Sequence, residues 1–291
     1  MFNIFKNRLE LTGTLNTITA LRISQGRSME PIGSDLPVVK DALGQPLIPG
    51  SSFKGALRSR LESFLRGIDP SLANDPSELV NRQFSELVKE IKEQHKDNDA
   101  ALSAALFQIT DAASQVFGSP WQASKFQVRD LTVKPDTWFN QYQERDGVSI
   151  DRDTETAAAG RLYDFQVVPA GTEFDFRAIV ENAEDWELGL LMIGLHQFET
   201  EQIPLGGGCS RGLGVVKLKN LKMQWINVCD DGNSSPNPSK LKTYLKNLVN
   251  GTDNPEIKDG SKYKKQWIDS FIHQLPLLIR TEDAQPAETN A

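Results

Sequence analysis

The sequence predicts an α+β fold in which helices pack on a ferredoxin-like (RRM-like) antiparallel sheet. Residues 9–23 alternate apolar and polar side chains, as a half-buried strand does. Residues 53–65 carry apolar side chains at helical spacing, and a second apolar helix at residues 185–198 leads through a glycine loop into a last strand. Strands that alternate with helices in this order are typical of the ferredoxin-like arrangement.

Composition places the chain among ordinary globular proteins. It has 291 residues, 38% hydrophobic and 24% charged, which suits one large domain or one domain with additions. No apolar run reaches the roughly 18 residues of a membrane span, and the first residues lack the apolar segment of a secretory signal. Two cysteines and three scattered histidines match no disulfide framework or zinc site. We therefore expect a cytoplasmic protein without membrane contact.

The acidic net charge of −7 argues against a protein that is basic over its whole surface, as many general nucleic-acid binders are. It does not exclude a local basic groove, because the acidic residues are unevenly distributed along the chain.

The first half of the chain predicts the beginning of the sheet and its first helix. Residues 9–23 form one strand, or two strands with a bend, and residues 36–40 form a short strand. Ser51 or Ser52 caps a helix that ends near Gly67. Lys54 and Arg58 lie outside the apolar stripe of this helix. Residues 68–110 then form a helical insertion on the surface.

The second half predicts the remaining strands. Residues 117–133 return to strand character, and residues 134–161 form a long loop or a protruding hairpin, which at this length is usually functional or disordered. Strands at 161–168 and 171–180, the helix at 185–198 and a strand at 215–225 complete a main domain over residues 1–226. Residues 227–291 form a linker and a C-terminal extension with helices at 241–249 and 263–278.

Residues 31–58 carry the side chains that suggest a chemical function. Asp35 lies in a loop, where a carboxylate suits a metal ion or a general base, but also a simple turn. The helix that begins after Gly50 presents free N–H groups and two cations, Lys54 and Arg58, one turn apart, which suits a phosphate. From these residues alone, a capped helix with a solvated basic face is the more common explanation.

The glycine-rich segment 206–212 raises the alternative of a free-standing nucleotide-binding enzyme. It lacks the Lys-Ser/Thr pair of a phosphate-binding Walker loop. It also follows a helix and precedes a strand, the reverse of a dinucleotide-binding turn. The segment therefore favours a tight turn between a helix and a strand.

Five segments occur in a characteristic order: GSDLPVVKD, LIPGSSFKGALR, VFGSPWQASKFQVRDL, SIDRDTETAAAGRLYDFQVVPAGTEFDF and PLGGGCSRGLGVVKL. Each is weak alone, but the ordered set resembles a backbone subunit of the RAMP superfamily, of the Csm/Cmr type, from a type III CRISPR–Cas effector complex. The resemblance covers residues 9–221 and leaves the 69–99 segment and the region after residue 227 unexplained.

The resemblance implies an RRM-like palm with a protruding thumb hairpin. Such subunits stack along a guide RNA (crRNA) beside other RAMP and Cas subunits, including the large Cas subunit. The guide pairs with a complementary target RNA, and each thumb displaces one nucleotide. In cleaving subunits an aspartate before the IPGSS segment cuts the target with a divalent cation such as Mg²⁺. A non-cleaving scaffold subunit of the same complex is the alternative.

The resemblance also implies roles for individual residues. Asp35 matches the cleavage and metal-binding aspartate, and Arg22 lies near a position where related subunits often carry a histidine, so Arg22 is a candidate phosphate contact instead. Aromatic residues of the thumb region, Trp138, Phe139 and Tyr142, either stack on bases or dock the loop. The remaining candidates are Ser51, Ser52, Lys54 and Arg58 for the guide, Gln127 and Arg129 for the RNA groove, Gly207, Gly208 and Arg211 for the RNA backbone, and Thr154 and Thr156 for the thumb tip.

Overall fold

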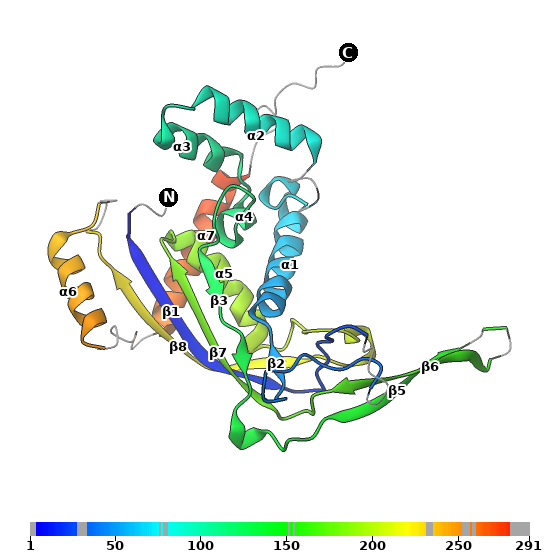
Figure 1. The fold of residues 1–291 in the computed structure, drawn as a ribbon. Coiled ribbons are helices and arrows are strands. Elements are labelled where there is room, and N and C mark those ends of the chain that lie inside the picture. Colours follow the sequence, from blue (N-terminus) through cyan, green and yellow to red (C-terminus); the bar gives the residue numbers. More distant parts are fainter. Residues whose placement is uncertain are drawn as a thin grey trace, which may run out of the picture.

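A four-stranded antiparallel sheet forms the centre of the protein, in the strand order β3–β7–β1–β8. The computed structural model describes residues 4–27, 34–75, 77, 81–150, 152–153, 155–230, 235–251, 257 and 260–279. Between β1 (Asn7–Thr17) and β3 (Phe126–Val128) runs α1 (Gly50–Ile68), and between β7 (Glu173–Glu181) and β8 (Val216–Asn227) runs α5 (Asp185–Glu199). This order and connectivity confirm the predicted ferredoxin-like sheet (Figure 1).

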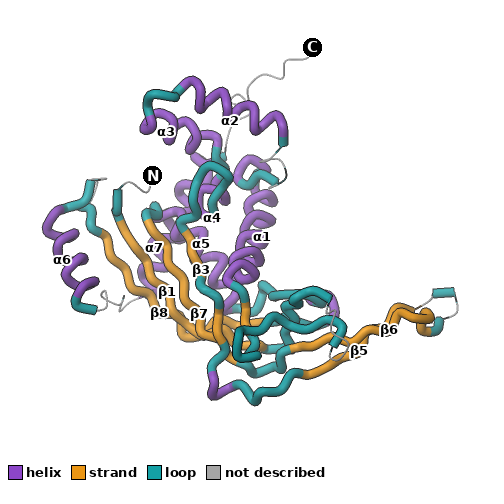
Figure 2. The backbone as a smooth tube through the Cα atoms, viewed as in Figure 1, coloured by secondary structure: helices purple, strands orange, loops and turns teal. Residues whose placement is uncertain are grey.

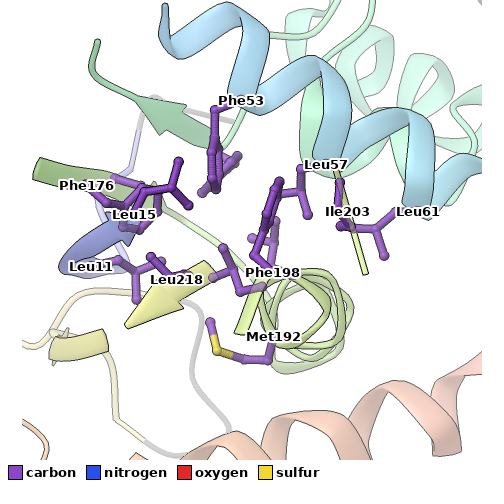
Figure 3. Packing of buried hydrophobic residues seen from close by; sticks show 14 of the residues in the cluster. Leu11, Leu15, Phe53, Leu57, Leu61, Phe176, Met192, Phe198, Ile203 and Leu218 are labelled. Atoms are coloured by element: carbon purple, nitrogen blue, oxygen red, sulfur yellow. The ribbon is translucent and has the colours of Figure 1, made fainter. Parts of the chain in front are cut away.

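The core lies between the sheet and the two helices α1 and α5 (Figure 3). The ring of Phe53 from α1 stacks on Phe198 from α5, with their centroids 4.4 Å apart, and lies 5.0 Å from Phe176 of β7. Leu11 and Leu15 of β1 are fully buried beneath them. Alternate strand residues therefore face these helices, as the sequence pattern predicted.

Residues 9–23, predicted as one strand or as two strands with a bend, form a regular strand only as far as Thr17. Beyond Thr17, Leu21 forms only an isolated antiparallel bridge with Val168. Residues 36–40 likewise make isolated bridges instead of a continuous strand, while β2 (Leu47–Ile48) pairs with β4 (Leu131–Thr132). These pairings are short because residues 36–48 pair with several different segments, each over only a few residues.

The sheet β3–β7–β1–β8 with α1 and α5 forms the palm. The thumb is a two-stranded hairpin of β5 (Gln143–Ile150) and β6 (Ala157–Val167), which protrudes from the palm (Figure 2). Its bounds differ from the predicted range 134–161. The first arm starts late because Trp138 is buried and Tyr142 packs on it, with the ring centroids 4.9 Å apart. The second arm continues to Val167, which pairs with Gln143 across the hairpin.

The insertion after α1 is helical, as predicted. It contains the short helix η1 (Pro70–Leu72), then α2 (Arg82–Gln94) and α3 (Asp99–Ile109). A further helix, α4 (Ala112–Phe117), was not predicted, because all six of its residues are buried and leave no alternation of polar and apolar positions. The side chain of Asp111 caps α4 by accepting a hydrogen bond from Ser114 N.

The C-terminal region contains α6 (Pro238–Val249) and α7 (Gly260–Leu278), close to the two predicted helices. However, α7 is not a peripheral extension, because Trp267 and Phe271 are buried in the main core. A Cβ atom at Gly189 of α5 would lie 2.1 Å from the carbonyl oxygen of Trp267, so α5 and α7 are in close contact. Among the described helices, none is long and apolar enough to cross a membrane.

Candidate functional site

Asp35 lies at the junction between the palm and the thumb. Its backbone N–H donates to Oδ1 of Asp164 on β6, with a distance of 2.8 Å, and the N–H of Asp164 approaches Oδ2 of Asp35 at 3.4 Å. The neighbouring residues, Leu36 and Phe165, form a parallel bridge. The loop that carries Asp35 is therefore attached to the base of the thumb.

Arg22 reaches the same junction from another segment of the palm. Its guanidinium carbon lies 4.6 Å from the centroid of the Phe165 ring, which is a cation–π contact. The carbonyl oxygen of Arg22 accepts a hydrogen bond from the N–H of Gly207, at 2.8 Å. A Cβ atom at Gly206 would lie 2.1 Å from that same oxygen, which explains the glycine there. Asp35 and Arg22 thus both contact β6, and the glycine loop contacts the backbone of Arg22.

The glycine loop is folded against the palm. The N–H of Gly207 donates to Arg22 and that of Gly214 donates to the carbonyl of Ala20. The N–H of Gly207 is thus used within the protein, while the contact of Gly207, Gly208 and Arg211 with the RNA backbone stays a prediction. These internal bonds also disfavour a phosphate cradle for a nucleotide. Gly208 begins the short helix η4 (Cys209–Arg211), whose Arg211 is exposed at the surface.

The N-terminus of α1 is capped differently from the prediction. Neither Ser51 nor Ser52 caps the helix; instead the first residue, Gly50, donates its N–H to Oδ1 of Asp130 at 2.8 Å. The carboxylate of Asp130, which directly precedes β4, thus accepts a hydrogen bond from an N–H group that could otherwise bind a phosphate. Ser51 is exposed, and Ser52 donates its N–H to the carbonyl of Pro49.

The two cations of α1 are partly engaged by the protein. Lys54 Nζ donates to Oγ of Ser124 at 2.7 Å, and Arg58 Nε donates to Oε1 of Glu62 at 2.6 Å. Burial lowers the pKa of Lys54, and the neighbouring charge of Arg58 lowers it further. Arg58 also donates to the carbonyl of Gly118, so it helps to hold the segment after α4. Within the described residues, no hydrogen bond or ion pair joins these two cations to Asp35.

The remaining predicted RNA contacts lie at the surface. Gln127 on β3 and Arg129 after it are exposed, and Arg129 is anchored by a bond from its N–H to the carbonyl of Arg177. Thr156 is exposed on the thumb, whereas Thr154 lies outside the described residues.

Of the aromatic residues in the thumb region, Tyr142 docks the loop and Phe139 is exposed for stacking on a base. Tyr142 docks the loop, because its hydroxyl donates to the carbonyl of Gly44 and Lys40 lies over its ring. Burial, followed by the charge of Asp41, raises the pKa of Tyr142 to about 12. Phe139 is 85% exposed and is the aromatic that remains available for stacking on a base.

Two residues that contribute to these contacts, Asp130 and Asp164, were not singled out from the sequence. Asp164 lies in the strand segment LYDFQVV, where a carboxylate among large apolar residues is the only local signal. Asp130 had no signal of its own, because its partner lies 80 residues away along the chain.

The carboxylates at the thumb junction suit a hard cation better than a zinc ion. The described residues contain no group of three or more His, Cys, Asp or Glu side chains that could enclose a metal. Mg²⁺, however, needs only one or two carboxylates and completes its shell with water and phosphate oxygens. Asp35 therefore fits a cation that is held jointly with a bound phosphate.

Sequence comparison decides the family. The model of the RAMP superfamily matches residues 14–217, which include β3 and β7 of the sheet, the thumb and the glycine loop. The chain belongs to the RAMP superfamily. Its RAMP fold explains why the elements around Asp35, Arg22 and the glycine loop appear in this order.

Curated relatives of this RAMP protein share one name, CRISPR system Cms endoribonuclease Csm3. The protein from Enterococcus italicus is 27% identical over 214 residues, which covers 73% of this chain and 90% of the relative. That from Mycobacterium tuberculosis is 27% identical and covers 74% of this chain and 88% of the relative. That from Methanocaldococcus jannaschii is 26% identical and covers 75% and 81%.

Proposed function

We propose that this chain is a backbone subunit of a type III CRISPR effector complex, which binds guide crRNA and cleaves the complementary target RNA. The observation that carries the proposal is the position of Asp35: its loop is bonded to the base of the protruding hairpin, beside Arg22. The naming of the Csm3 relatives as CRISPR endoribonucleases supports the same reaction. Its partners are the crRNA, the target RNA and other Cas subunits, in the cytoplasm.

The chemistry assigned to the site is attack by a ribose 2′-hydroxyl of the target RNA on the adjacent phosphate. The attack forms a 2′,3′-cyclic phosphate and breaks the bond to the 5′-oxygen of the next nucleotide, which leaves as a hydroxyl after it takes a proton from water. The thumb displaces a nucleotide and thereby presents this phosphate at the palm junction. Asp35 accepts the proton that the 2′-hydroxyl loses, and Arg22 supplies a cation for the phosphate oxygens. A Mg²⁺ ion bound by Asp35 supplies Lewis-acid activation of the phosphate when present.

The experiment is a cleavage assay with the assembled complex and a labelled complementary RNA. Wild-type complex is expected to produce regularly spaced cuts that a chelator abolishes and added Mg²⁺ restores. An Asp35→Ala subunit should assemble and bind target RNA but lose the cuts. Unchanged cutting by Asp35→Ala would leave the second candidate, a scaffold subunit that holds the guide without cleaving. Cuts that persist in chelator would contradict the requirement for a metal ion but not the proposed cleavage activity.

A further inference from the structure

Asp164 lies on β6 beside the backbone of Asp35, the residue proposed to cut the target RNA. Its Oδ1 accepts the backbone N–H of Asp35, at 2.8 Å, so the side chain of Asp164 holds the main chain of the residue proposed to cut. In the opposite direction, the N–H of Asp164 approaches Oδ2 of Asp35, at 3.4 Å. The two aspartates are thus joined by reciprocal contacts across 129 residues of sequence.

The attachment continues along the strand. Leu36 and Phe165 form a parallel bridge, and the N–H of Gln166 donates to the carbonyl of Leu36 at 3.1 Å. The segment after Asp35 lacks a long strand pairing of its own, because residues 36–40 make only isolated bridges. The thumb strand β6 is therefore a main support of the loop that carries Asp35.

The same strand also carries the ring on which Arg22 rests, at Phe165. A shift of β6 along or across the palm would move both Asp35 and the Arg22 contact. Because a misplacement of about 1 Å at a reacting centre can cost about 100-fold in rate, the attachment of the loop to β6 has consequences for cleavage.

We propose that Asp164 is a positioning residue that couples the thumb hairpin to the cleavage loop, so that seating of the thumb on the RNA sets the position of Asp35. This proposal rests on the proposed cleavage by Asp35. Asp164 acts through the backbone of Asp35, and its required property is a hydrogen-bond acceptor, not a negative charge.

The test compares Asp164→Ala with Asp164→Asn in the assembled complex under single-turnover conditions. Alanine removes the acceptor, so the cleavage rate is expected to fall about 10- to 100-fold, with guide retention and target affinity unchanged. Asparagine keeps an oxygen that can accept the Asp35 N–H and is expected to restore most of the rate. Equal losses in both variants would overturn the positioning role, because the charge and not the acceptor would then matter.

Asp146 provides a matched control. It lies opposite Asp164 across the same hairpin and is exposed, and its side chain has no hydrogen bond among the described residues. Asp146→Ala removes the same charge from the same part of the thumb and is expected to leave the rate within twofold of wild type, roughly the limit for an exposed surface change. A loss equal to that of Asp164→Ala would show a general thumb effect and contradict the proposal.

The Asp35→Ala complex separates the two hypotheses. If Asp35→Ala loses cutting and Asp164→Ala cuts at the normal rate, the positioning role of Asp164 is wrong and cleavage by Asp35 stands. Normal cutting by the Asp35→Ala complex would contradict both hypotheses, because Asp35 would then not be the cleavage residue.

Discussion

The backbone nitrogen of Gly50 and the carboxylate oxygen Oδ1 of Asp130 lie 2.8 Å apart, so a residue from the connection between β3 and β4 caps the first turn of α1. The serines that follow Gly50 do not perform this role. The carboxylate lies where the partial positive charge of the helix is greatest, which stabilises the helix start.

Replacing Asp130 with Ala is therefore expected to lower the free energy of unfolding by about 1 kcal/mol, the usual effect of removing a helix cap. Asp130→Asn retains an acceptor oxygen and should cost less. Chemical denaturation of the three proteins measures the difference. Equal stability of Asp130→Ala and wild type would show that water replaces this cap without loss.

Gly50 itself should not tolerate a side chain. A Cβ atom would lie 2.6 Å from the carbonyl oxygen of Val128 and 2.9 Å from that of Arg129, and both are backbone atoms that cannot turn away. We expect Gly50→Ala to destabilise the protein by about 1–3 kcal/mol, as overpacking does.

Gly55, one turn later in the same helix, is the control for this change. Nothing lies within 4 Å of the position of its Cβ atom. Gly55→Ala should therefore stabilise the protein by about 0.5–1 kcal/mol through helix propensity. Thermal unfolding of both variants checks that the two changes in stability have opposite signs. A stabilising effect of Gly50→Ala would contradict the close approach of the Val128 and Arg129 carbonyls to Gly50.

The sequence predicted the parts of the fold that depend on local patterns. Alternation along β1 and the helical stripe of Phe53, Leu57 and Leu61 were sufficient for the sheet and α1, because burial of one face produces these periods. The ordered segments also predicted the family, which the match over residues 14–217 confirms.

Contacts between distant polar residues could not be predicted in this way. Asp164 meets Asp35 across 129 residues and Asp130 meets Gly50 across 80. A hydrogen bond of this kind requires one acceptor at one place and produces no repeat along the chain. The packing of α7 on α5 was missed for a related reason, since apolar residues in α7 show that it has a partner but not which one.

The buried ion pair between Lys125 and Glu187 should be essential for stability. Lys125 Nζ lies 2.6 Å from both carboxylate oxygens, and the two side chains are 4% and 1% exposed. Glu187→Gln leaves the ammonium group buried without a charge partner and is expected to cost about 3–5 kcal/mol.

A surface ion pair on α2 gives the comparison. Arg82 and Glu86 lie 2.9 Å apart with 93% and 56% of their side chains exposed. Glu86→Gln should change stability by less than about 0.5 kcal/mol. Denaturant titrations that show similar effects for the two glutamates would contradict the importance of burial.

Phe139 should contribute to RNA binding without contributing to the fold. It is 85% exposed, whereas Trp138 beside it is buried. If a base stacks on Phe139, Phe139→Ala weakens target binding by about 1–3 kcal/mol and leaves thermal unfolding unchanged. Leu43→Ala, at a residue that is 83% exposed, controls for the loss of an exposed apolar side chain. Equal affinities of Phe139→Ala and wild type would exclude the stack.

Guide binding should depend on the protonation of Lys54. Burial and the charge of Arg58 lower the pKa of Lys54 below its ordinary value of 10.5, so this lysine loses its charge earlier than an exposed one as pH rises. A bound phosphate favours the charged ammonium, so crRNA binding is coupled to proton uptake above this lowered pKa. Affinity is therefore expected to fall as pH rises through that value.

Lys54→Arg tests the cause, because a guanidinium stays charged across the whole range. Guide affinity of assembled complexes, measured from about pH 7 to about pH 10, should fall less for Lys54→Arg than for wild type. Lys54→Met should bind more weakly at the low end and show little further decrease. The same pH dependence in all three proteins would assign the titration to another group and would remove Lys54 from the guide-binding surface.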